Sequence, residues 1–373
     1  MVKKIVFIVI VVFLCHLYGN VSIKAGERGF DGYDQEKITG VFIDDERIGL
    51  KRERIKNQHE PTYSAFLELK NQKAELLRRE SHVPDEWYVP AFYRDSEGHR
   101  QSKAALQDDA NTAYKLALLY RLTDNIDCAK AAVRLIDAWS GLENLQRHDD
   151  SQLSFTYHFP AMIFAADMLR GSEFWTPGIE DRFTSFLRER AIPMNTMDRE
   201  NNWGNWGLVL VLAGAAFLDD DKLFGEGVER WKYFIEEQIA EDGHLPHEVT
   251  RNNGIGERGI WYTHFTLMPQ TIAAEIARVN GVDLYEYRSP SGRSLELAFR
   301  WISPFVLNPD NFPYFKPDEG REQLGTNYVN YFEILNSRWP DDAAEELLKR
   351  HRPVRATHST PVLTLTHGEP LSN

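Results

Sequence analysis

The sequence predicts an all-α protein whose helices pack in pairs around an axis: an α/α toroid, or incomplete barrel of helical hairpins, forming a single domain. Segments with apolar residues at helical spacing follow one another along most of the 373 residues. Few stretches alternate with the period of two that is typical of a strand, and the clearest is 360–366. No short fixed repeat is evident, which favours a toroid over the alternative, a helical solenoid.

The most regular element is a helical hairpin. Residues 113, 116, 117 and 120 are apolar or aromatic at i, i+3, i+4 and i+7, and residues 129, 132, 133 and 136 repeat the pattern. Thr123, Asp124 and Asn125 between them supply a turn and a cap. Further helices are expected at 63–79, 159–169, 179–190, 206–217, 223–239, 265–279, 295–302 and 343–350.

The N-terminus has the pattern of an export signal. Lys3 and Lys4 precede an apolar run from residue 5 to residue 14, which is too short to span a bilayer comfortably, and a cleavage site is expected after Ala25. We therefore expect a signal peptide at 1–25 and one domain at 26–373, in the periplasm or outside the cell. A lipid anchor at Cys15 is less favoured, because Leu14 stands where such sites usually have a small residue.

The charge limits the classes of partner. Removal of the three lysines of residues 1–25 takes the formal net charge from −13 to −16, which disfavours nucleic acid and anionic membranes. An anionic sugar is still compatible, because a local basic cleft can lie on an acidic body. No later segment predicts a membrane span, and the sequence does not indicate how chains assemble.

Five connections are rich in polar and aromatic residues: 83–95, 154–160, 199–207, 241–265 and 308–320. They contain no Walker loop, GxSxG or HExxH motif. His244, His247 and Glu248 form only a weak metal signal, because a proline lies between the two histidines and no clear third ligand is evident. No metal or cofactor is predicted.

The connection 241–265 gathers Arg251, Arg258, Tyr262 and three histidines. These groups suit the β-elimination of a uronic-acid polymer. That reaction needs a cation or amide to neutralise the sugar carboxylate, a base to remove the C5 proton, and an acid to protonate the departing O4. Aromatic side chains add flat surfaces on which sugar rings can lie.

Four stretches also resemble a known family. "ENNWGNW" at 200–206 is similar to the "NNH…W" signature of alginate lyases of the helical-toroid type, polysaccharide lyase family 5 and its relatives. "DGHLPHEVTR" at 242–251 matches their D-G-x-L-P-x-E-x-x-R pattern. The hairpin at 106–139 and "FPAMIFAADML" at 159–169 resemble the family's helices, so the resemblance runs from about Val83 to about Thr266.

The resemblance implies roles for individual residues. Asn202 would help to neutralise the substrate carboxylate, Arg251 would be the active-site arginine, and Tyr262 would protonate the leaving oxygen. Trp203 stands where the family has a histidine, and a tryptophan cannot act as a base. The catalytic prediction comprises Tyr262, Asn202, Arg251 and His264; the substrate-binding prediction comprises Asn201, Trp203, Trp206, Tyr157, His158, His247 and Arg258.

Several alternatives remain open. Tyr262 can act as both base and acid if a neighbouring arginine lowers its pKa, or the base can be His158, His247 or His264. Arg258 can replace Arg251 as the functional arginine. Asn202 can be a helix cap, Trp206 a core residue, and Arg251 an ion-pair partner of Glu248.

Two other classes compete with a lyase. A glycoside hydrolase would use paired carboxylates, such as Asp242 with Glu248 or residues around Asp108 and Asp109. A noncatalytic uronate-binding protein would explain Trp203.

Overall fold

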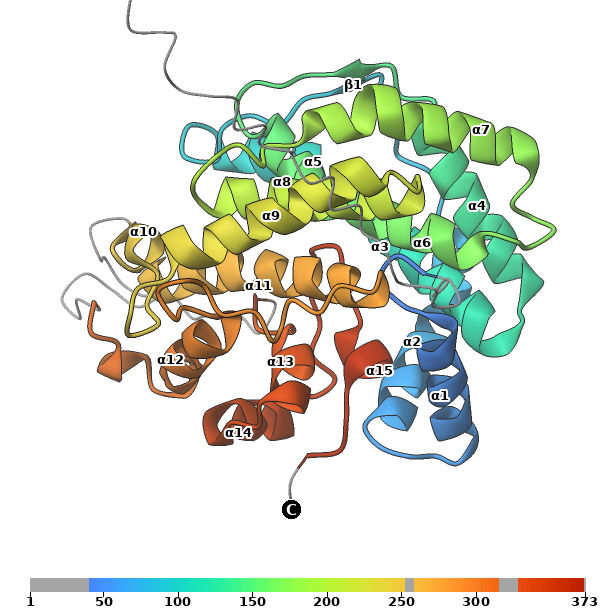
Figure 1. Cartoon of the computed structure of the whole chain (residues 1–373). Helices are drawn as coiled ribbons and strands as arrows, with labels where there is room; N and C mark the ends of the chain where they lie inside the picture. Colours follow the sequence, from blue (N-terminus) through green and yellow to red (C-terminus); the bar gives the residue numbers. More distant parts are fainter. Residues whose placement is uncertain (1–39, 252–257, 315–327, 372–373) are drawn as a thin grey trace, which may run out of the picture. The chain divides into compact units, whose positions relative to one another are not determined.

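The computed structural model describes residues 40–251, 258–314 and 328–371. Residues 38–373 form one compact unit, and the predicted signal peptide lies outside the described residues. Almost all of the regular structure is helical (Figure 1). Of the helices in this part of the chain, none combines the length and apolar character needed to cross a bilayer.

The first half of the chain contains α1 (Asp45–Lys56), α2 (Thr62–Arg78), β1 (Glu86–Trp87), α3 (Ser96–Thr123), α4 (Ile126–Ser140), β2 (Asn144–Leu145), α5 (Ser151–His158), α6 (Pro160–Leu169), α7 (Pro177–Phe186), a π-helical turn (Leu187–Ala191) and a 3-10 turn (Ile192–Met194). The second half contains α8 (Asn202–Phe217), α9 (Asp221–Gln238), α10 (Pro246–Val249), α11 (Arg258–Val279), α12 (Leu295–Leu307), a 3-10 turn (Pro309–Asn311), α13 (Phe332–Arg338), α14 (Asp342–His351) and α15 (Leu363–His367). β1 and β2 pair in parallel.

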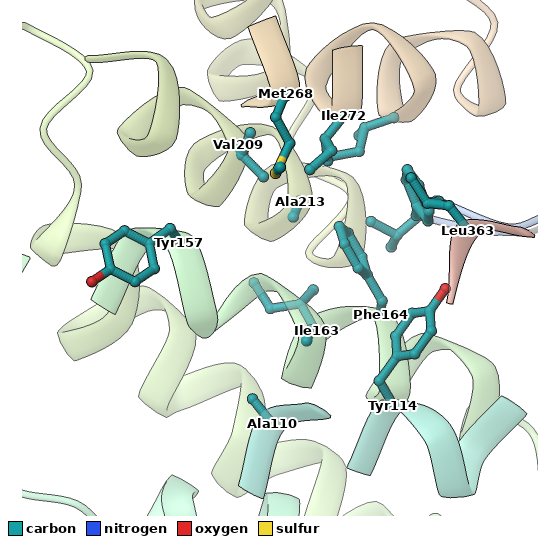
Figure 2. Packing of buried hydrophobic residues seen from close by; sticks show 14 of the residues in the cluster. Ala110, Tyr114, Tyr157, Ile163, Phe164, Val209, Ala213, Met268, Ile272 and Leu363 are labelled. Atoms are coloured by element: carbon teal, nitrogen blue, oxygen red, sulfur yellow. The ribbon is translucent and has the colours of Figure 1, made fainter. Parts of the chain in front are cut away.

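Packing between helices follows a closed circuit. α3 packs against α4 and α6, α6 against α8, and α8 against α9 and α11. α11 packs against α12, α12 against α14, α14 against α13, and α13 against α15, which returns to α1 and α2 beside α3. Side chains from α3, α6, α8, α11 and α15 meet in one apolar core (Figure 2).

The predicted hairpin is present as α3 and α4. Asp124 adopts the left-handed conformation (φ 56°) that ends α3, and the Asn125 side chain accepts a hydrogen bond from the Cys128 N–H at 3.2 Å. Cys128 is buried, as expected for a small apolar residue.

The helix containing Trp206 begins earlier than predicted. α8 starts at Asn202, so most of the polar stretch 199–207 belongs to its first two turns. Gly207 permits this because a Cβ there would lie 2.5 Å from the Thr196 and Met197 backbone nitrogens. Gly204 is equally confined, by the Arg199 carbonyl. The first turns of α8, which contain the polar residues, therefore pack directly against the backbone of residues 196–199.

The strand-like alternation at 360–366 is a wrong prediction, since Leu363–His367 is helix α15. All five of its residues are buried, so the alternation does not separate an inner face from an outer face. The Thr364 hydroxyl donates to the Glu333 carboxylate at 2.5 Å, which satisfies a polar group inside the core.

Glu275 of α11 joins the two ends of the circuit. Its buried carboxylate accepts hydrogen bonds from Tyr285 Oη at 2.8 Å and Arg278 Nε at 3.0 Å. Arg47 of α1 and His367 of α15 lie 3.4 and 3.2 Å from the same group. The Glu275 pKa is lowered, because the hydrogen bond and charges of His367, Arg278 and Arg47 outweigh the effect of burial.

Candidate active site

The start of α8 supplies two asparagines with different partners. Asn201 is the helix cap, since its side-chain oxygen accepts a hydrogen bond from the Trp203 N–H at 3.1 Å. Asn202 is buried, and both its backbone N–H and its Nδ2 donate to the Glu248 carboxylate at 3.2 Å. The capping interpretation therefore applies to Asn201 and leaves the Asn202 amide for Glu248.

Glu248 is a buried carboxylate at the centre of this group. It belongs to the short helix α10, which Pro246 begins. Besides Asn202, it accepts a hydrogen bond from Arg251 Nε at 3.2 Å. Burial raises the Glu248 pKa, while Arg251 and Asn202 act against that rise. The ion pair with Arg251 was one of the alternatives expected from the sequence, and it fixes the guanidinium in place.

Tyr262 lies in the first turns of α11 beside that guanidinium. The Arg251 guanidinium carbon is 4.8 Å from the centre of the Tyr262 ring, within the range of a cation–π contact. The Tyr262 hydroxyl is 2.5 Å from the hydroxyl of Tyr93, which precedes α3. Asn202, Glu248, Arg251, Tyr262 and Tyr93 thus form one connected group, called here the tyrosine–arginine cluster.

The expectation of a lowered Tyr262 pKa is wrong for this structure. Burial and the hydrogen bond between the Tyr262 and Tyr93 hydroxyls raise the Tyr262 pKa, and the opposing charges of Arg251 and Arg258 do not compensate. The Tyr262 phenol therefore holds its proton firmly.

Trp203 is half-buried at the edge of the same helix start. The Arg199 guanidinium stacks over its ring at 4.0 Å. An indole with a cation on one face is a suitable wall for a sugar bearing a carboxylate. His247, also predicted to bind substrate, is exposed one residue before Glu248.

Three predicted aromatic residues belong to a more buried group. Trp206 has no exposed surface, and its ring lies 5.5 Å from His358 and 5.9 Å from Tyr157. His158 is also buried and stacks on His358 at 5.6 Å. Burial lowers the pKa of both histidines, to about 3 for His358. These rings therefore form one buried, uncharged aromatic group.

His264 points away from the tyrosine–arginine cluster. It is fully buried, its Nδ1 lies 2.7 Å from the Tyr331 hydroxyl, and its ring packs against Phe332. Burial lowers its pKa to about 3. His264 is two residues from Tyr262 on one helix, so the two side chains leave α11 on different faces.

Lys103 of α3 lies beside the aromatic rings described above, a position that the sequence did not reveal. Its ammonium lies 5.5 Å from the Tyr157 ring, and within the described part of the chain it forms no ion pair. Burial, with the nearby Arg100, lowers its pKa. A partly desolvated cation beside an aromatic ring can receive a carboxylate, but in the sequence Lys103 is an ordinary residue of an amphipathic helix.

The carboxylates proposed for a hydrolase have other partners. Asp109 accepts hydrogen bonds from His82 N at 2.7 Å and Trp139 Nε1 at 3.0 Å, which ties the 79–82 turn to α3 and α4. Asp242 pairs with His244. Across residues 40–251, 258–314 and 328–371, no three His, Cys, Asp or Glu side chains come together as metal ligands would.

Comparison with known proteins identifies the family of the chain. A family model described as alginate lyase matches residues 52–312. The chain belongs to the alginate lyase family. A curated polysaccharide lyase from Stenotrophomonas maltophilia is 30% identical over 47% of this chain and 50% of its own length. An alginate lyase from Pseudomonas fluorescens is 31% identical over 31% of this chain and 29% of its own length. The chain thus spans about half, or less, of these curated relatives.

Solved structures of the alginate lyase family share the fold. A histidine-to-alanine variant of alginate lyase A1-III, complexed with a tetrasaccharide, aligns with a TM-score of 0.74 at 19% identity, covering 92% of this chain and all of that one. An alginate lyase from Bacteroides ovatus aligns with a TM-score of 0.65 at 16% identity, covering 89% of this chain and all of that one. The prediction of an all-α toroid is confirmed.

Proposed function

We propose that this member of the alginate lyase family is a polysaccharide lyase that cleaves a uronic-acid polymer, alginate or a related polyuronate, by β-elimination. One observation carries the proposal: Glu248 holds the Arg251 guanidinium against the face of Tyr262, 4.8 Å from its ring. A cation and a protonated phenol are thereby placed side by side. Family membership and the names of the relatives support the same reaction class.

The residues divide the chemistry between them. Arg251 binds the substrate carboxylate, which stabilises the negative charge that develops when the C5 proton leaves. Tyr262 protonates O4 as the C4–O4 bond breaks; its raised pKa means that the phenol carries the proton that this step needs. Asn202 acts through Glu248, since its amide is committed to that carboxylate. Trp203 with Arg199 offers a wall for a neighbouring sugar.

The test is a substrate panel with two tyrosine variants. Purified protein is incubated with alginate, glucuronan, hyaluronan and pectate while ultraviolet absorbance is followed, because elimination leaves a C4–C5 double bond conjugated with the carboxylate. We expect absorbance to rise with at least one polymer and to be lost in Tyr262→Phe. Tyr88→Phe is the matched control, because the Tyr88 hydroxyl bonds to Asp149 outside the tyrosine–arginine cluster. Chain shortening without absorbance would indicate a hydrolase, and binding without shortening a noncatalytic protein.

We also propose that residues 1–25 direct export and are removed after Ala25. The basic start and the apolar run of the sequence support this proposal. Determining the N-terminal residue of the protein from a periplasmic fraction tests it: Gly26 is expected, and a retained N-terminus or a lipid on Cys15 would contradict it.

A further inference from the structure

Arg199 is an exposed cation in the turn that leads into α8. Its guanidinium stacks on the indole of Trp203, with 4.0 Å between the guanidinium carbon and the ring centre. Among the residues that the structure describes, the Arg199 side chain forms no ion pair and no hydrogen bond. The acid next in sequence, Glu200, already accepts hydrogen bonds from Arg230 at 3.1 Å and from the Tyr233 hydroxyl at 2.8 Å. The N–H groups of Arg199 are therefore available to a bound anion.

The backbone that carries this stack is held by hydrogen bonds. Arg230 of α9 donates to the carbonyl oxygens of residues 197, 198 and 199, at 2.7, 2.9 and 3.2 Å. The Thr196 hydroxyl donates to the Trp203 carbonyl at 2.7 Å, which ties the turn to the start of α8. Both members of the stack are thus on fixed backbone, so little of the turn has to be ordered when a ligand binds.

The stack is next to the tyrosine–arginine cluster along α8. Trp203 directly follows Asn202, whose amide donates to the Glu248 carboxylate at 3.2 Å. The same carboxylate accepts the hydrogen bond from Arg251 Nε. Successive helix residues point about 100° apart, so Asn202 faces the interior while Trp203 stays half-buried at the edge. The two cations, Arg251 and Arg199, are therefore carried by one connected set of residues.

We propose that Arg199 and Trp203 form a second carboxylate subsite, which binds the uronate next to the one at Arg251; this inference rests on the proposed function. A guanidinium that stacks on an aromatic ring keeps its N–H donors in its own plane, where they can bind both oxygens of a carboxylate. The indole holds the guanidinium flat and adds an apolar surface for the sugar ring.

This subsite gives the enzyme a substrate preference. A polymer in which every sugar is a uronate presents one carboxylate to Arg251 and another to Arg199. A polymer that alternates a uronate with a neutral sugar leaves the Arg199 guanidinium without a ligand. Arg199 thereby selects the first kind of polymer over the second.

The experiment uses two forms of one polymer and three variants. The polymer is the fully uronic substrate on which wild type is most active, either intact or with most of its carboxylates reduced to alcohols. In the reduced form a remaining uronate is flanked by neutral sugars. Arg199→Gln removes the charge, and Arg199→Lys keeps the charge without the planar fork. Arg350→Gln is the control, because Arg350 is an exposed arginine that pairs with Glu346 on α14.

The expected result is a loss of binding that depends on the neighbouring carboxylate. On the intact polymer, Arg199→Gln should raise KM by about 5–20-fold and leave kcat within about threefold, as for the loss of one exposed charge-assisted contact. Arg199→Lys should raise KM less, and Arg350→Gln should not change it. On the reduced polymer, the KM values of wild type and Arg199→Gln should agree within about threefold, because the contact is then absent from both. The Tm of Arg199→Gln should stay within about 2 °C of wild type, as for other surface substitutions.

The outcomes distinguish the two proposals. Wild type that releases no unsaturated product from any polymer overturns the proposed function and this inference with it. With active wild type, an unchanged KM of Arg199→Gln on the intact polymer overturns the inference alone, and so does an equal rise in KM on both forms. Wild type that cleaves only the intact form supports the inference when Arg199→Gln also raises KM on that form, because the neighbouring carboxylate is then required.

Discussion

Replacement of Glu248 by glutamine separates activity from stability. Three donor groups reach the carboxylate at 3.2 Å: the Asn202 N–H, the Asn202 amide and Arg251 Nε. A hydrogen bond to a charged group contributes about 1.5–3 kcal/mol and a neutral one about 0.5–1.5, so three bonds lose about 3 kcal/mol together. Arg251 is partly exposed, so its hydrogen bond to Glu248 contributes an energy at the lower end of the range for charged groups.

An opposing effect is of similar size. Glu248 is buried, so its charge carries a desolvation penalty that the neutral glutamine does not have. Removing this penalty stabilises the folded state by several kcal/mol, on the order of the hydrogen-bond energy that is lost. The free energy of unfolding of Glu248→Gln should therefore stay within about 1 kcal/mol of wild type, which corresponds to a Tm change of about 2–4 °C. Activity should fall about 10²-fold, because a displacement of about 1 Å in a positioned group has this effect.

The pH dependence gives a second check on Glu248. A carboxyl whose pKa is raised on folding destabilises the native state once pH exceeds its unfolded pKa, and not below it. The Tm of Glu248→Gln relative to wild type should accordingly be higher at neutral pH than at acidic pH. Calorimetry and initial rates measure both quantities, with exposed Glu241→Gln as the control in the same connection. Near-normal activity, or a Tm loss above about 10 °C, would refute the reasoning.

Two further substitutions test other parts of the structure. Gly207→Ala should lower the free energy of unfolding by about 1–3 kcal/mol or more by thermal melting, because its Cβ would meet backbone nitrogens at 2.5 Å; an unchanged Tm would show that the turn before α8 can yield. Lys103→Met should raise KM for the polymer by about 5–30-fold with little change in kcat, as expected for the loss of one charge-assisted contact of about 1–2 kcal/mol. An equal increase in KM for a neutral oligosaccharide would contradict a role for Lys103 in binding the carboxylate.

Local patterns predicted the fold well because helices are encoded by neighbours in sequence. The α3–α4 hairpin, with its turn at Asp124 and cap at Asn125, follows from spacing and capping chemistry alone. The predicted helix boundaries were wrong where tertiary packing, rather than local sequence, determines where a helix begins. α8 begins four residues before Trp206 because its glycines fit tightly against the preceding turn.

The candidate site was only partly predictable. Arg251 and Tyr262 were identified by a motif, but the sequence did not show that their side chains are in contact. Tyr93 lies in a connection noted for its aromatic residues, but no pattern links it to a residue 169 positions away. His264 and Trp206 were selected by type, and burial, which the sequence does not reveal directly, places both in the interior.

The most direct test of the central claim is mass analysis of the products formed in water enriched in heavy oxygen. Elimination breaks the C4–O4 bond without adding water, so the fragment masses should sum to that of the parent oligouronate, with no heavy oxygen incorporated. Fragments that together carry one added water, with its oxygen label at the new reducing end, would contradict a lyase and establish hydrolysis.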